Sequence, residues 1–142
     1  MKERYKIIRC GQFYDGVTAE WKPGQSILVD GGRIAAVGAQ VPEPENALEI
    51  DLRGCQVTPG MIDAHMHMDY IDWHTVREEV YTTSEEAKTL AIARCARMAL
   101  ARGFTTVRHV GGITSNGYGV LDVKEAVERG YLPGARIVAA PV

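Results

Sequence analysis

From residue 57 onward the chain alternates short apolar runs with segments of helical periodicity, and this alternation constrains the fold more than any other feature. Extended runs are expected at residues 57–67, 104–110 and 136–140, with helices at 83–103 and 120–129. Strands separated by single helices join into a parallel sheet through right-handed crossovers. The pattern therefore predicts a parallel sheet or an α/β barrel, in which the run at 57–67 is a buried strand.

The first of these helices carries its own boundary signals. Thr83 followed by Glu86 is typical of a capping box at a helix start, and Gly103 is typical of a helix end. Helical spacing predicts one buried stripe along it. We expect that stripe to consist of Ala87, Ala91, Cys95 and Met98.

The N-terminal part of the sequence predicts β-structure without helices. Tyr5–Cys10 is a candidate strand, and Glu49–Leu52 resumes extended structure after a proline-containing loop. Residues 27–37 place two apolar runs around Asp-Gly-Gly, which is a strong hairpin signal. These segments suit a small sheet or one edge of a β-sandwich.

His65 and His67 stand at the C-terminal end of the strand expected at residues 57–67. Side chains two residues apart on a strand point to the same face, so the two imidazoles are expected side by side. Imidazole is a common protein ligand for Zn²⁺, and strand carboxyl ends are where α/β proteins gather ligands and catalytic groups. The pair therefore predicts half of a metal site, the alternative being two hydrogen-bonded histidines in a polar pocket.

Charge and cysteine content argue against several functional classes. The net charge of −2 predicts no general affinity for nucleic acid or an anionic membrane. No run of 18 apolar residues is present to span a bilayer, and no apolar segment follows the charged start as in a signal peptide. Three widely spaced cysteines predict free, mostly buried thiols in a cytoplasmic protein: Cys10, Cys55 and Cys95.

Several segments resemble one known family in the order in which that family carries them. Residues 59–67, Pro-Gly-Met-Ile-Asp-Ala-His-Met-His, resemble the first-strand signature of the metal-dependent amidohydrolase superfamily. The hairpin at 27–37 resembles that of its N-terminal β-sandwich. Residues 102–108 resemble a strand of its prolidase-like and imidazolonepropionase-like members, and residues 128–136 resemble the lead-in to strand three. The resemblance covers nearly the whole chain.

This resemblance implies an α/β fold in two incomplete parts. Residues 1–56 would belong to a β-sandwich, and residues 57–142 would form the first three strands and two helices of a TIM-type (β/α)₈ barrel. It further implies hydrolysis of a carbon–nitrogen bond in a small amide, dipeptide or cyclic amide by metal-activated water. One or two divalent ions, Zn²⁺ first among them, are the expected cofactor, and a homo-oligomer is expected for the full-length protein.

The resemblance also assigns roles to particular residues. His65 and His67 would ligate the metal, and Asp63 would either hold an imidazole in the right tautomer or cap nearby backbone. Two other histidines are candidates for the substrate pocket. His109 stands where the family strand usually carries Asp and could instead add a ligand, and His74 follows the first strand. For both, a role outside the site is the alternative.

Family members take the remaining ligands and the general-base Asp from later strands. A complete barrel needs about 250 residues, so we expect no catalytic residue within these 142 residues and no activity from this chain alone. Three hypotheses follow: part of an amidohydrolase, an interaction module that retains the histidine pair, or a non-catalytic metal-binding protein.

Overall fold

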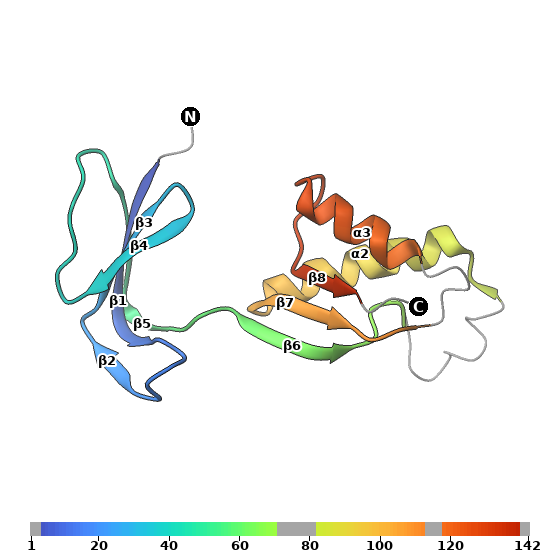
Figure 1. Ribbon diagram of the computed structural model, residues 1–142, viewed down its shortest axis with the longest axis horizontal. Helices are drawn as coiled ribbons and strands as arrows, with labels where there is room; N and C mark the ends of the chain where they lie inside the picture. Colours follow the sequence, from blue (N-terminus) through green and yellow to red (C-terminus); the bar gives the residue numbers. More distant parts are fainter. Residues whose placement is uncertain (1–3, 71–81, 113–117, 140–142) are drawn as a thin grey trace. The chain divides into compact units, whose positions relative to one another are not determined.

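The computed structural model describes residues 4–70, 82–112 and 118–139. The chain divides into two compact units, Met1–Pro59 and Gly60–Val142, whereas the family resemblance implies a boundary after residue 56. The first unit is a largely antiparallel sheet, and the second combines parallel strands with helices (Figure 1). The mixed α/β fold predicted from the sequence is therefore confirmed.

The first unit is a five-stranded sheet arranged around the long strand β1 (Tyr5–Tyr14). β1 pairs antiparallel with both β2 (Trp21–Pro23) and β3 (Ser26–Asp30), and β3 pairs with β4 (Arg33–Gly38). β5 (Leu48–Val57) runs parallel to β1. A small core of buried side chains stabilises this sheet and includes Ile7, Leu28 and Val41.

The hairpin predicted at residues 27–37 is confirmed. Asp30 pairs with Arg33, so that Gly31 and Gly32 alone form the turn between β3 and β4. These two glycines have φ angles of 56° and 88°. Glycine adopts such angles at little cost, which is why this dipeptide is a reliable turn signal.

β1 and β5 are both longer than predicted. Their additional halves contain glycine and polar residues, which give a weak strand signal by themselves. In the structure these halves pair with one another, with Gln12 opposite Gln56 and Phe13 opposite Val57. Pairing between distant segments, which local sequence does not encode, therefore sets the length of both strands.

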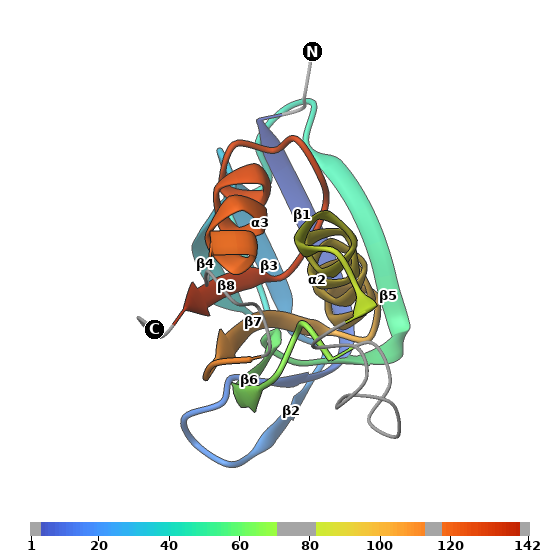
Figure 2. The same cartoon turned by 90° about the vertical axis from the view of Figure 1, so that its right-hand side faces the viewer.

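The second unit has the predicted β-α-β-α-β order. The parallel strands β6 (Met61–Met66), β7 (Phe104–His109) and β8 (Arg136–Ala139) lie in that order in the sheet. Helices α2 (Glu85–Ala101) and α3 (Tyr118–Glu128) connect them and lie side by side on the sheet (Figures 1 and 2). No helix in the described ranges is long and apolar enough to cross a membrane.

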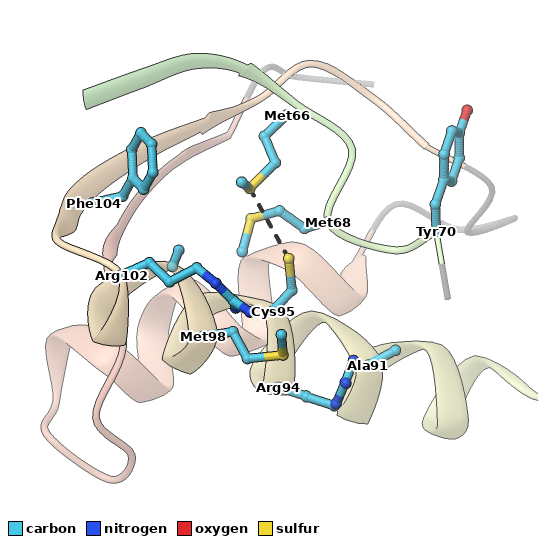
Figure 3. A pocket seen from close by; sticks show the side chains of 10 residues that line it. Met66, Met68, Tyr70, Ala91, Arg94, Cys95, Met98, Arg102 and Phe104 are labelled. Carbon is cyan, nitrogen blue, oxygen red and sulfur yellow. Dashed lines mark hydrogen bonds between the residues drawn. The ribbon is translucent and has the colours of Figure 1, made fainter. Parts of the chain in front are cut away.

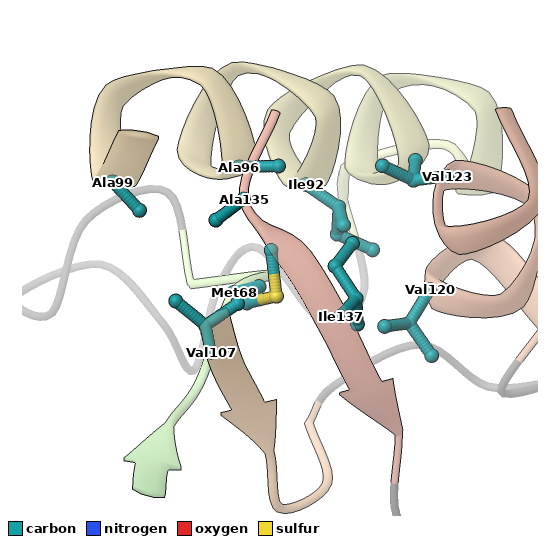
Figure 4. Close-up of a cluster of buried hydrophobic side chains, with 9 residues drawn as sticks. All are labelled: Met68, Ile92, Ala96, Ala99, Val107, Val120, Val123, Ala135 and Ile137. Atoms are coloured by element: carbon teal, nitrogen blue, oxygen red, sulfur yellow. The ribbon is translucent and has the colours of Figure 1, made fainter. Parts of the chain in front are cut away.

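The core of this unit lies between the two helices and the sheet (Figure 4). α2, α3, β7, β8 and the segments beside them all contribute to it: Met68, Ile92, Ala96, Ala99, Val107, Val120, Val123, Ala135 and Ile137. The stripe predicted for α2 is wrong by one position, because the helix buries Lys88, Ile92, Ala96 and Ala99 instead. Periodicity gives the spacing of a buried stripe, whereas the position of the sheet decides which stripe is buried.

The start of α2 is also shifted by one residue from its prediction. Ser84, not Thr83, is the N-cap: its backbone is extended and its side chain accepts a hydrogen bond from the Ala87 N–H at 3.2 Å. Both residues have a hydroxyl suited to capping. The backbone angles at Ser84 decide between them.

The buried strand expected at residues 57–67 is in fact two strands. β5 ends at Val57 and β6 begins at Met61, with Pro59 and Gly60 between them. β6 is also not buried, since the Ile62 side chain is 70% exposed. β6 stands at one edge of the described three-stranded sheet, which explains this exposure.

The three cysteines are free thiols, as the sequence predicts. Cys10 is buried and Cys95 is partly buried, but Cys55 on β5 is exposed. The expectation that these thiols are mostly buried is therefore wrong for Cys55.

Candidate metal centre

His65 and His67 lie side by side at the carboxyl end of β6. Their ring centroids are 5.4 Å apart and their planes are inclined at 71°. Two imidazoles that share one tetrahedral Zn²⁺ have ring centres about 5 Å apart, because each Zn–N bond is about 2 Å long. The juxtaposition predicted from the sequence is present, and the ring separation fits a shared divalent ion.

Two neighbours fix the orientation of the His67 ring. Its Nδ1 lies 2.6 Å from the carbonyl oxygen of Gly111. A carbonyl only accepts hydrogen bonds, so Nδ1 carries the proton and the neutral ring keeps its lone pair on Nε2. The ring also stacks on Tyr70, with centroids 4.8 Å apart and planes within 5° of parallel. His67 is thus set to offer Nε2 to a ligand.

β6 is irregular between Asp63 and Met66, the stretch that contains His65. Asp63 pairs with Val107 and Met66 pairs with His109, so β6 advances by three residues where β7 advances by two. Such a bulge re-aims side chains and often lies beside functional sites. It also interrupts the regular alternation of side chains along β6.

Asp63 makes a backbone contact. Its Oδ1 accepts a hydrogen bond from the backbone N–H of His65 at 3.0 Å. This contact corresponds to the capping alternative of the two roles considered for Asp63. A role for its carboxylate in orienting an imidazole stays a prediction.

His109 is buried at the end of β7, with 2% of its surface exposed. Its Nδ1 accepts a hydrogen bond from the Met68 N–H at 3.3 Å. Burial lowers the pKa of His109, and the nearby charge of Asp69 acts in the opposite direction. The roles predicted for this histidine, in the substrate pocket or as a ligand, remain predictions. His74 lies outside the described residues.

Asp69 also belongs to this region, although no sequence pattern singles it out. The residue is fully buried, and its carboxylate fills the space that a side chain on Gly112 would occupy. Its charge acts on His109. The available signal was its position two residues after His67. Nothing local to that position indicates burial.

The histidine pair alone does not complete a metal site. Within the part of the chain that the structure describes, no group of three or more His, Cys, Asp and Glu side chains could hold a metal ion. Catalytic zinc sites normally use three protein ligands. His65 and His67 therefore fit a metal as part of a larger ligand set.

An apolar cavity of about 510 Å³ lies between α2 and the sheet, and Tyr70 is among the residues that line it (Figure 3). Its lining includes Ala91, Cys95 and Met98, three of the four residues of the stripe predicted to be buried. The Cys95 Sγ lies 4.0 Å from the Met66 Sδ. Burial raises the pKa of the Cys95 thiol, so the protonated form is favoured and a nucleophilic role is not.

Comparison with known proteins defines the class of this chain. Residues 56–142 match the model of the Amidohydrolase family. This match extends over more than half of the chain and includes the histidine pair, β6, β7 and β8. The chain belongs to the amidohydrolase family.

Individual relatives agree with this assignment. The chain is 34% identical over 102 residues to a dihydroorotase of Anaeromyxobacter sp. (strain K), which covers 72% of this chain. It is 31% identical over 138 residues, or 95% of this chain, to adenine deaminase 2 of Agrobacterium fabrum (strain C58 / ATCC 33970). The crystal structure of a Xaa-Pro dipeptidase with bound methionine superimposes with a TM-score of 0.82 and 28% identity over 96% of this chain.

The matched part of these proteins is small. The chain spans 19% of the dihydroorotase and 20% of the adenine deaminase. It spans 33% of the dipeptidase chain.

Proposed function

We propose that this chain is part of a metal-dependent hydrolase of carbon–nitrogen bonds, in which His65 and His67 hold a divalent ion, Zn²⁺ first among the candidates. The arrangement of the two rings carries this proposal, because their centroids are 5.4 Å apart and His67 keeps Nε2 available for a ligand. A divalent ion at this position would supply Lewis-acid chemistry, lowering the pKa of water and polarising a carbonyl group.

The chain's own residues serve to orient these ligands. The Gly111 carbonyl holds the proton on Nδ1 of His67, which is the usual way in which a ligating imidazole is fixed. The Asp63 carboxylate holds the backbone at His65. No third ligand joins the pair within the described residues, and the family resemblance implies that the remaining ligands and the general base come from later strands. The 142-residue chain by itself should therefore not turn over substrate.

For the substrate we propose a small amide, dipeptide or cyclic amide. The similar proteins are named for dihydroorotate, adenine and Xaa-Pro dipeptides. Cleavage of a C–N bond is the chemistry these substrates have in common, and it supports the choice of reaction class.

A second candidate is a metal-binding or interaction module without catalysis. The observation that favours it is that two metal-binding side chains, and not three, come together in the described ranges. Hydrolytic activity separates the two candidates.

The test uses the longest reading frame that contains this chain, purified and supplied with Zn²⁺. It is assayed for hydrolysis of Xaa-Pro dipeptides, N-acyl amino acids and cyclic amides. His65→Ala and His67→Ala should each lower kcat/KM by about 100-fold or more, since loss of a group that merely supports a ligand already costs about 10–100-fold. Unchanged hydrolysis in both variants would contradict the proposal. Metal binding without hydrolysis of any of these substrates would favour the module.

A further inference from the structure

The segment that follows β7 contacts the segment that follows β6 residue by residue. We call residues 109–112 the β7 clamp. Three hydrogen bonds join the clamp to the end of β6 and the turn after it. The Val110 N–H donates to Met66 O at 3.2 Å, Nδ1 of His67 donates to Gly111 O at 2.6 Å, and the Met68 N–H donates to Nδ1 of His109 at 3.3 Å. In addition, the Asp69 carboxylate occupies the space that a side chain on Gly112 would fill. Four consecutive residues around His67 are thus held by four consecutive residues of the clamp.

Among the four residues of the clamp, His109 is the one whose side chain contributes most directly to these contacts. The contacts at Val110 and Gly111 use backbone atoms, which almost every residue carries. Gly112 contributes by lacking a side chain. His109 is the member whose side chain makes a hydrogen bond, and at 2% exposure its ring is shielded from water that could replace that bond.

The His109 contact acts directly on the geometry of His67. Met68 follows His67, so a hydrogen bond to the Met68 N–H fixes the peptide plane that joins these two residues. That plane sets the direction in which the His67 side chain leaves the backbone, and so whether its Nδ1 reaches the Gly111 carbonyl. To accept from Met68, Nδ1 of His109 must carry its lone pair, which places the proton of the neutral ring on Nε2.

We propose that His109 is a positioning residue for His67. By accepting the Met68 N–H it holds the turn after β6 so that His67 bonds Gly111 through Nδ1 and presents Nε2 to a ligand. The effect on the His67 ring does not depend on metal chemistry. The consequence for metal affinity rests on the proposed function.

The first readout is the tautomer of His67 in the metal-free chain. Long-range ¹H–¹⁵N spectra of the imidazoles, recorded at about pH 8 where free histidines are neutral, report which nitrogen carries the proton. The wild-type chain should show the Nδ1–H form of His67. His109→Leu removes the acceptor at similar volume, and should convert His67 to a mixture of tautomers and speed hydrogen exchange of the Met68 amide.

Two amide variants separate positioning from mere packing. His109→Asn places its oxygen near the position of Nδ1 and should restore the wild-type tautomer and the slow Met68 exchange. His109→Gln places its oxygen further along the side chain, near Nε2, and should not. Wild-type behaviour of His67 in a folded His109→Leu would overturn the proposal. If that variant does not fold, equal His67 spectra for the Asn and Gln variants would overturn it.

Zn²⁺ titration of the same proteins separates this proposal from the proposed function. His109→Gln should weaken binding by about 10-fold or more relative to His109→Asn, the size of effect found when a ligating histidine loses its support. If His109→Leu changes the tautomer of His67 but none of the proteins binds Zn²⁺, the positioning role is supported and the metal site is contradicted. Equal Zn²⁺ affinity in the two variants, despite different tautomers, would overturn the extension to metal binding.

Discussion

Gly112 is a single residue on which the burial of Asp69 depends. A Cβ at this position would overlap the Asp69 carboxylate, which is fully buried. Gly112→Ala should therefore lower the free energy of unfolding of the second unit by about 1–3 kcal/mol, the usual cost of overpacking. Urea denaturation followed through amide signals of β7 and α2 measures this change.

The matched control is Gly54→Ala on β5, where a Cβ meets no heavy atom within 4 Å. This variant should change stability by a few tenths of a kcal/mol at most, as is usual for an exposed site. An equal loss of stability in the two variants would show that the Asp69 contact is not the cause.

Asp15 is the residue whose titration is most clearly set by its neighbours. Its carboxylate accepts hydrogen bonds from Lys22 Nζ at 2.7 Å and from the backbone N–H groups of Val17 and Thr18 at 2.8 and 2.9 Å. The bond from Lys22 is the largest of the effects that hold the pKa of Asp15 well below its ordinary value. Because the folded-state pKa is the lower one, the carboxylate stabilises the fold above about pH 4 and loses this contribution as the pH falls further.

Lys22→Met should accordingly raise the pKa of Asp15 toward the ordinary carboxyl value. A pH titration of the Asp15 carboxyl carbon by NMR measures this in both proteins. The same midpoint with and without Lys22 would refute the assignment. The two backbone hydrogen bonds remain in the variant, so the predicted shift is partial.

Among the elements, α2 allows a direct comparison of two adjacent capping residues. Ser84→Ala removes the acceptor of the Ala87 N–H and should cost about 1 kcal/mol of stability. Thr83→Ala, the change at the position that the capping-box pattern predicts, should cost much less. Urea denaturation of both variants tests this, and a larger loss for Thr83→Ala would place the N-cap one residue earlier.

The elements also show what local sequence does and does not determine. The turn at Gly31 and Gly32 and the order of strands and helices in the second unit follow from residue type and spacing, and both were predicted. The stripe of α2 and the full lengths of β1 and β5 depend on where distant segments lie, and these predictions were wrong or incomplete. A neighbour that is far away in the sequence leaves no periodic signal at the position that it contacts.

In the candidate site, too, some contacts could be predicted from the sequence and others could not. His65 and His67 are two residues apart at the end of β6, so their proximity could be predicted from the sequence. The contact between His67 and Gly111 spans 44 residues, and the one between Met68 and His109 spans 41. These contacts depend on the parallel pairing of β6 with β7, whose register includes shifts that the sequence pattern does not reveal.

For the chain as a whole, the exposed side of β6 predicts self-association. β6 is an edge of the described sheet, and its Met61 and Ile62 side chains are 46% and 70% exposed. Exposed apolar edge strands pair readily with other chains. Sedimentation velocity of the 142-residue chain should therefore show concentration-dependent assembly, reduced by Ile62→Lys.

The interaction-module hypothesis makes the opposite prediction for this experiment. A self-contained module would remain a monomer at all concentrations, with or without the lysine. Leu90→Lys on helix α2, where the side chain is 72% exposed and no strand edge is involved, serves as a control for a general gain in solubility. If the two lysine substitutions reduce assembly equally, the β6 edge is not the specific cause of self-association.

The most direct test of the central claim, that His65 and His67 bind one ion together, is a Zn²⁺ titration of the 142-residue chain followed through the imidazole nitrogens. Cys55→Ser serves as the background, because the exposed Cys55 thiol could bind Zn²⁺ by itself. We predict that the Nε2 signal of His67 and a ring nitrogen of His65 shift with one common midpoint, while the Nδ1–H of His67 is retained. His65→Ala should weaken the response of His67. Separate midpoints for the two histidines, or no shift of either, would contradict the account.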